Sequence, residues 1–386
     1  MDLSYILNEL GEERENYFNA IAPPIIQTSN FKFDTVDKLR TAFEDEFKGN
    51  LYSRGMNPTI DILRKKLAAL DGAEDALVFG SGIAAIAIPV IALLKAGDHV
   101  ICVENPYSWT IKLFTELLPR FGVNCTFVDG SQPDAIENAI QSNTRLIYLE
   151  SPNTFSFEVQ DLESISKMAK KRGILTMIDN SYCSPLYQQP IALGIDLVAQ
   201  SATKYLGGHS DVVAGVVTGS KDLIKRIFDK DYMNIGASMA PQNAWLLIRS
   251  LRTFPTRMEK ISKNAEIIIK WLENHPKIEK VLYPFNPALP SYAIAKKQMK
   301  GMGGLFSIIL KNADANQIEE FCNQLKHIMM AVSWGGHESL IIPAVAGIKR
   351  AEFNPSNERH KLIRIYIGLE EPEYLIKDLE RAFKVI

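Results

Sequence analysis

The stretch DALVFGSGIAAIAIPVIALLKAGDHVICV, residues 75–103, decides the fold. Its two short apolar runs, DALVF and HVICV, flank a glycine turn and a longer apolar segment of helical length. A strand, a helix and a second strand in this order form a βαβ unit, whose strands are parallel and buried. The runs VNCTFV (123–128), RLIYLE (145–150) and ILTMID (174–179) continue the pattern, with amphipathic segments between most of them. The alternation predicts an α/β fold with a mostly parallel sheet and helices on both faces.

Three regions of the chain differ in pattern. Residues 56–240 carry the strand–helix alternation, and we expect them to form the main domain. Residues 241–386 mix strand-like runs such as LFSIIL with amphipathic helices, which predicts a smaller C-terminal α+β domain. Residues 1–55 do not join the alternation. They form either an arm that contacts another subunit or a layer on their own subunit, and their pattern alone does not separate the two.

The composition excludes several classes of protein. Of the 386 residues, 46% are hydrophobic and 23% charged, and 43 Lys+Arg against 45 Asp+Glu give a net charge of -2. A nucleic-acid-binding protein usually has a basic surplus, and a disordered chain lacks apolar residues. The four cysteines form no CxxC pair, so we expect neither a metal site nor a disulfide framework. Without a secretory pattern or a stretch of about 20 apolar residues, we expect a cytoplasmic protein with no membrane partner.

Polar residues follow several of the expected strands, at the sheet edge where open parallel sheets bind ligands. Gly80-Ser81-Gly82-Ile83 follows DALVF and opens a helix, a pattern typical of a phosphate site or simply of a tight turn. Asp179 follows another buried run. A buried carboxylate needs a partner, so Asp179 either serves a ligand or caps its turn with Asn180.

A lysine beside two hydroxyls is the most informative feature of the sequence. In LVAQSATKYLGGHSD, residues 197–211, an apolar run ends at Ser201, Thr203 and Lys204. Apolar surroundings favour the neutral amine, which is the form that attacks a carbonyl, and the hydroxyls can bind a phosphate. Asp179 could then pair with a pyridinium nitrogen. Arg364, inside the apolar run LIRIYI, can bind a substrate carboxylate or pair with an internal acid.

Several longer motifs occur together with these residues. They are Asp179-Asn180, Ser201-Ala202-Thr203-Lys204-Tyr205 with Gly208-His209-Ser210-Asp211, and Tyr52-Ser53-Arg54 with Asn57-Pro58-Thr59. With these motifs, nearly the whole chain resembles the Cys/Met-metabolism family of pyridoxal-5'-phosphate (PLP) enzymes, the trans-sulfuration family of cystathionine and methionine lyases and cystathionine γ-synthase. The resemblance implies the fold type I of PLP-dependent transferases, which is aspartate aminotransferase-like, and PLP as the cofactor.

The resemblance also assigns roles to matching residues. Lys204 would bind PLP covalently and act in catalysis with Tyr107, which would stack on the cofactor ring. Asp179 would hold the protonated pyridine nitrogen. The remaining cofactor-binding residues would be Ser201, Thr203, Gly82 and Ile83 at the phosphate, Thr154, which stands where the commoner family form has Asn, and Tyr52 and Arg54 from the neighbouring subunit. Arg364, Ser333, Trp334 and Tyr52 would contact the substrate. His209 and Asp211 are interpreted as structural, and no metal is implied.

Two segments are most similar to bacterial cystathionine β-lyases. Trp334, in SWGGHESL, stands where γ-acting relatives more often have leucine, and Thr154 matches a small hydroxyl residue of the β-lyases. We therefore expect a carbon–sulfur β-lyase that cleaves cystathionine or a related cysteine thioether to a thiol, pyruvate and ammonia. The alternatives are a γ-acting family member, namely a γ-lyase or γ-synthase, and a PLP-binding protein without turnover. The resemblance implies an amino-acid substrate and a homotetramer built from dimers with shared active sites. Because Tyr52 and Arg54 would serve the neighbouring subunit, it also favours residues 1–55 as an inter-subunit arm.

Overall fold

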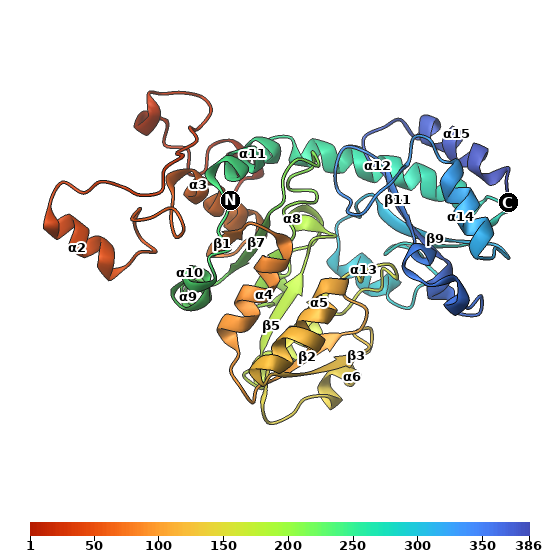
Figure 1. Cartoon of the computed structure of the whole chain (residues 1–386), viewed down its shortest axis with the longest axis horizontal. Helices are drawn as coiled ribbons and strands as arrows, with labels where there is room; N and C mark the ends of the chain where they lie inside the picture. The colour runs from red at the N-terminus through yellow and green to blue at the C-terminus, as the bar shows by residue number, and fades with distance from the viewer.

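The computed structural model describes residues 1–386, which form two β-sheets connected by helices (Figure 1). The larger sheet has seven strands in the order β1-β7-β6-β5-β4-β2-β3. Its strands are β1 (Asp75–Phe79), β2 (His99–Val103), β3 (Asn124–Val128), β4 (Thr144–Glu150), β5 (Leu175–Asp179), β6 (Leu197–Gln200) and β7 (Gly215–Gly219). All adjacent pairs are parallel except the two that involve β7. The predicted mostly parallel sheet is confirmed.

Helices cover both faces of this sheet, and alternate residues of each strand point to opposite faces. In β2, Val100 and Cys102 pack in the cluster that contains helix α4 (Gly82–Leu93), whereas Ile101 and Val103 pack in the cluster of α7 (Leu162–Lys171). Because both faces are covered, the central residues of strands such as β2 and β4 are apolar on both faces rather than alternating with polar residues. The other helices of this region are α3 (Pro58–Asp71), α5 (Ser108–Lys112), α6 (Pro133–Asn138), α8 (Ser184–Tyr187), α9 (Lys221–Ile227) and α10 (Met233–Ile235).

The C-terminal part has its own sheet of five strands in the order β10-β11-β12-β9-β8. Helix α11 (Pro241–Leu251) packs on α3, and the 20-residue helix α12 (Phe254–Glu273) runs from there to the second sheet (Figure 1). The strands are β8 (Ile278–Leu282), β9 (Leu305–Leu310), β10 (Met329–Met330), β11 (Leu340–Pro343) and β12 (Leu362–Tyr366), and the helices α13 (Tyr292–Gln298), α14 (Ala315–Gln324) and α15 (Pro372–Phe383). The domain boundary expected at residue 240 stays a prediction.

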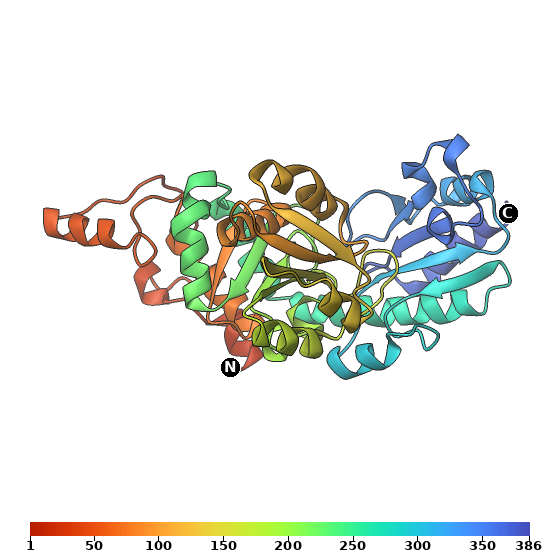
Figure 2. The ribbon, with the colours of Figure 1, turned by 90° about the horizontal axis from the view of Figure 1, so that it is seen from below.

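The N-terminal segment, residues 1–55, has a packed part that contains α1 and a projecting part that contains α2. Helix α1 (Leu3–Asn8) buries Ile6 and Leu7 against α3, and the buried Lys66 ammonium of α3 pairs with Glu12 at 3.1 Å. Helix α2 (Val36–Glu44) instead projects at the end of the molecule opposite the C-terminal sheet (Figure 1, Figure 2). Apolar side chains of this projecting part are largely exposed, namely Phe18, Ile21, Val36 and Phe43. None of the helices is both long enough and apolar enough to cross a membrane.

Candidate functional site

The carboxyl ends of three neighbouring parallel strands bring the candidate residues together. Strand β4 ends at Glu150 and β5 ends at Asp179, and these two residues are register partners. Strand β6 ends at Gln200, from which the chain continues directly into Ser201 and Lys204. Residues that stand far apart in the sequence therefore meet at one sheet edge, as expected for the ligand site of an open parallel sheet.

Lys204 lies largely buried between the two sheets. Its ammonium donates a hydrogen bond of 2.6 Å to the Ser333 hydroxyl and lies 5.6 Å from the centre of the Trp334 ring. Burial and the charge of the nearby Arg364 together lower the pKa of Lys204 to about 8, against the opposing effect of Asp179. A lowered pKa increases the fraction of neutral amine near pH 7, which is the nucleophilic form. The expectation from the sequence is met by burial and by a neighbouring cation.

Asp179 lies beside Lys204 and Tyr107. Burial raises the pKa of Asp179, while hydrogen bonds from Ser181 and the charge of Lys204 oppose that rise. The backbone N–H of Ser181 donates to one carboxylate oxygen at 2.9 Å. Burial also raises the pKa of Tyr107, and the charge of Asp179 adds to that effect. The Tyr107 side chain is 43% exposed, so a face of its ring is open to a ligand.

The start of α4 and Ser201 form a compact polar pocket wall. Ser81 caps the helix by accepting a hydrogen bond from the Ala84 N–H, so the amides of Gly82 and Ile83 have no partner inside the helix. A Cβ atom on Gly82 would lie 2.7 Å from the Ser201 hydroxyl oxygen. Only glycine lets the helix N-terminus approach Ser201 this closely. Amides at a helix N-terminus beside a hydroxyl suit a phosphate group.

Thr203, the second hydroxyl expected at the phosphate, is engaged elsewhere in this structure. Its hydroxyl donates to the Ala214 carbonyl at 3.1 Å and accepts from the Ala214 N–H at 3.0 Å. To donate a hydrogen bond to a phosphate, the Thr203 hydroxyl would have to give up its hydrogen bond to the Ala214 carbonyl. Ser181, which the sequence analysis did not select, has its hydroxyl 2.7 Å from the Ser201 N–H, which donates to it. Ser181 thus holds Ser201 at the end of β6.

Arg364 projects from β12 toward Ser333. One of its terminal nitrogens donates to the Ser333 carbonyl at 3.3 Å, and no carboxylate of the chain forms an ion pair with it. Burial lowers the pKa of Arg364 to about 10, and the nearby Glu150 carboxylate acts in the opposite direction. Ser333 itself has a left-handed backbone with φ 80°. A non-glycine residue held in this region is typical of functional sites. Ser333 therefore contacts both cations, Lys204 through its hydroxyl and Arg364 through its carbonyl.

Glu150 is a central residue of the site to which the sequence analysis gave no role. One of its carboxylate oxygens accepts hydrogen bonds from the N–H and the hydroxyl of Thr154, and the other accepts from the Tyr107 N–H at 2.7 Å. Burial and the charge of Asp179 together raise the pKa of Glu150 to about 7, although the hydrogen bonds from Thr154 and Tyr107 oppose the rise. The signal was available, because Glu150 ends an apolar strand just as Asp179 does.

Tyr52 and Arg54 stand apart from this group within one chain. The Arg54 guanidinium lies over the Tyr52 ring at 5.4 Å, and neither residue is hydrogen-bonded to Lys204, Asp179 or Ser201. Their expected service to the neighbouring subunit stays a prediction. His209, interpreted as structural, lies with its Nδ1 2.7 Å from the carbonyl oxygen of Gly207.

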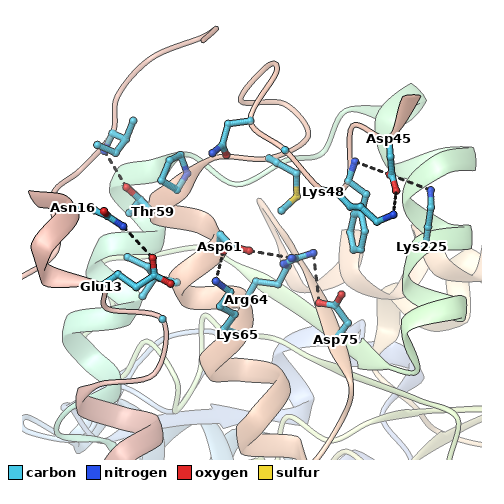
Figure 3. Close-up of a pocket in the computed structure, with 18 of the residues that line it drawn as sticks. Glu13, Asn16, Asp45, Lys48, Thr59, Asp61, Arg64, Lys65, Asp75 and Lys225 are labelled. Carbon is cyan, nitrogen blue, oxygen red and sulfur yellow. Dashed lines mark hydrogen bonds and ion pairs between the residues drawn. The ribbon is translucent and has the colours of Figure 1, made fainter. Parts of the chain in front are cut away.

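A cavity of about 800 Å³ lies between the N-terminal segment and α3 (Figure 3). Its charged side chains pair with one another, as Asp61 does with Arg64 and Lys65, and as Asp45 does with Lys225. None of the site residues expected from the sequence lines it. The cavity therefore lies in the contact between the N-terminal segment and the main body, apart from the region around Lys204.

Comparisons with known proteins place the chain in a family. The family described as Cys/Met metabolism PLP-dependent enzyme matches residues 6–384. The chain belongs to this family. An L-methionine gamma-lyase of Fusobacterium nucleatum is 40% identical over 96% of this chain and 95% of its own length. A cystathionine gamma-lyase of Bacillus subtilis is 38% identical and a cystathionine beta-lyase of Lactococcus lactis 39% identical, each over 97% of both chains. The crystal structure of metB from Corynebacterium glutamicum matches with a TM-score of 0.91 and 33% identity, covering 100% of this chain and 98% of its own.

Family membership identifies the cofactor as PLP and confirms the expected fold type I. The residues present also fit PLP on structural grounds. Because Gly82 approaches Ser201 closely, the backbone amides at the start of α4 and the Ser201 hydroxyl lie together where a phosphate could bind. Lys204 supplies an amine of lowered pKa, and Asp179 supplies a carboxylate beside it. Family and relatives together indicate a PLP-dependent carbon–sulfur lyase of the trans-sulfuration family.

Proposed function

We propose that this protein uses PLP to cleave a carbon–sulfur bond at the γ-carbon of a sulfur-containing amino acid. The observation that carries the reaction class is the placement of Lys204, which lies near both Asp179 and Arg364 and is hydrogen-bonded to Ser333. An amine that can move a proton, a carboxylate and an unpaired guanidinium meet at one place. These are the groups needed to bind an amino acid by its carboxylate and to act on its α-carbon.

Each residue has a distinct part in this mechanism. When bound, PLP supplies the electron sink for bonds at the substrate's α-carbon. Arg364 binds the substrate carboxylate with N–H groups that have no carboxylate partner in the chain. Asp179 holds a proton at the pyridine nitrogen. Lys204, with its lowered pKa, accepts the α-proton at Nζ and can return it, because the same atom holds the proton after the first transfer.

Elimination at the γ-carbon differs from β-elimination by one further proton removal, at the β-carbon. The chain needs no additional residue type for it, because Lys204 can accept that proton as well. The γ reading is favoured by the methionine gamma-lyase and cystathionine gamma-lyase relatives at 40% and 38% identity. The β reading keeps support from Trp334, Thr154 and the cystathionine beta-lyase relative at 39%.

Cystathionine separates the two readings because the carbon skeletons end in different keto acids. Cleavage on the γ side releases cysteine, ammonia and 2-oxobutyrate, and cleavage on the β side releases homocysteine, ammonia and pyruvate. We expect 2-oxobutyrate, and we expect the same keto acid with methanethiol from methionine. Pyruvate without 2-oxobutyrate would establish the β-lyase instead. Neither keto acid from cystathionine, cystine, methionine and O-acylhomoserines would favour PLP binding without turnover.

We also propose that the working enzyme is a homotetramer of dimers whose active sites combine residues of two subunits. The proposal is supported by the exposed apolar side chains in the projecting part of the N-terminal segment, of which Phe18 is 100% and Val36 71% exposed. Exposed apolar surface of this kind is typical of an interaction surface. Tyr52 and Arg54 at the end of this segment would then contact the neighbour's cofactor. Sedimentation equilibrium tests the assembly, and a fully active monomer would contradict it.

A further inference from the structure

Arg364 is held by an unusual set of neighbours. Its guanidinium carries five N–H donors, of which the structure engages one at 3.3 Å with the Ser333 carbonyl. The group also lies over an aromatic ring, since the Arg364 Cζ is 5.1 Å from the centre of the Phe155 ring. A guanidinium stacked on a ring is stabilised through its face and keeps its N–H edges free. Phe155 therefore restrains Arg364 without occupying the donors that a carboxylate would use.

The backbone of Phe155 indicates that the ring is placed there by its surroundings. Phe155 has φ 67°, a left-handed conformation that a bulky residue rarely adopts. The preceding residue is anchored, since the Thr154 N–H donates to Glu150 at 2.8 Å and its hydroxyl donates to the same carboxylate oxygen. The following turn is closed by the Phe157 N–H, which donates to the Asn153 carbonyl at 3.1 Å. The turn thus keeps Phe155 in a conformation that it would otherwise avoid.

We propose that Phe155 is a positioning residue for substrate recognition, whose ring orients the Arg364 guanidinium so that its free edge meets the substrate's α-carboxylate. Glu150 supports this arrangement by fixing the turn through Thr154. The proposal rests on the proposed function, because it takes an amino acid as the substrate. It extends that function by naming the residue that sets how strongly a carboxylate is preferred over a neutral group at the same position.

The test compares two small ligands that differ only in the carboxylate. Glycine has no side chain to eliminate, and glycinamide carries an amide in place of its carboxylate. Their binding to the holoenzyme is measured by isothermal titration calorimetry for wild type, Phe155→Leu and Phe155→Tyr. We expect Phe155→Leu to weaken glycine binding roughly two- to thirtyfold, the range of a cation–π contact, and to leave glycinamide binding unchanged. Phe155→Tyr keeps the ring and should bind glycine as wild type does.

Controls separate this role from a general loosening of the site. Phe121→Leu makes the same substitution at an exposed position away from Arg364 and should bind both ligands normally. A Phe155→Leu protein that binds glycine as wild type does, or that loses glycine and glycinamide binding equally, would overturn the proposal. A wild-type protein that binds glycinamide as tightly as glycine would also overturn the proposal. Keto-acid formation from cystathionine or methionine is measured separately, so a failure of the proposed function is recognised independently of the binding result.

Discussion

Asp71 is a buried carboxyl group that contacts Gln200, the last residue of β6, and replacing it with Asn should stabilise the protein at neutral pH. It ends α3, is fully buried, and accepts hydrogen bonds from the Gln200 side chain at 2.8 and 3.0 Å and from the Thr218 hydroxyl at 2.8 Å. Burial raises the pKa of Asp71 to about 7, although these hydrogen bonds oppose the rise. An Asn keeps the acceptor for Gln200 and carries no charge to bury.

The direction of the pH effect follows from the raised pKa. Below about pH 3 the carboxyl is protonated in the folded and the unfolded chain, so it costs nothing. As pH rises toward 7, the unfolded chain releases the proton while the folded chain keeps it, and folding stability is lost. A difference of about three pKa units corresponds to roughly 4 kcal/mol in full. Between about pH 5.5 and about pH 8, the part still to be lost is roughly 2 kcal/mol.

Urea unfolding followed by circular dichroism measures this, with wild type and Asp71→Asn at equal protein concentration and saturating PLP. The advantage of Asp71→Asn should grow by roughly 2 kcal/mol between about pH 5.5 and about pH 8. Asp378→Asn is a matched control. Burial raises the pKa of Asp378, but backbone N–H groups of Ile328, His327 and Lys326 outweigh burial and leave the pKa lowered. That control should lose stability by the same amount at both pH values. A difference between Asp71→Asn and wild type that is constant with pH would refute the reasoning.

Three further predictions concern the site. Lys204→Ala should abolish keto-acid formation and the absorbance of lysine-bound PLP; turnover that persists would remove Lys204 from the mechanism. Gly82→Ala places a Cβ 2.7 Å from the Ser201 side chain and should raise the PLP dissociation constant at least about tenfold in equilibrium dialysis, whereas Gly347→Ala, with open space around it, should not. Co-expressed Lys204→Ala and Arg54→Ala chains should form hybrids more active than either variant alone if sites are shared; no recovery in verified hybrids would argue against sharing.

The fold was largely predictable because strands that are buried on both faces appear in the sequence as short apolar runs separated by helical segments. Strands such as β2 and β4 contain continuous apolar runs, and α4 has no polar side chain, so local patterns sufficed to place them. The pattern did not show that β7 runs antiparallel to both of its neighbours. Strand direction depends on how the connecting loop returns, and the short run GVVTG looks the same in either direction.

The candidate site was predictable where one residue combines an unusual type with an unusual place. Lys204 and Asp179 at the ends of apolar strands and Arg364 inside one were visible in this way. Glu150 shows the same signal, but its role depends on two partners, Tyr107 and Thr154, that only folding brings to its carboxylate. Hydrogen bonds of side chains to other segments produce no regular pattern in the sequence, so these contacts could not be predicted from it.

The sequence by itself determined the fold class and the family, and it singled out Lys204 as the candidate catalytic lysine, because these follow from local composition and motifs. Only the tertiary structure decided which residues surround that lysine. It placed the Ser333 hydroxyl 2.6 Å from the Lys204 ammonium, engaged Thr203 with Ala214, and set the Phe155 ring against Arg364. The physical reason is that pKa shifts and contacts depend on spatial distance and on burial. The number of residues between Lys204 and Ser333 along the chain predicts neither quantity.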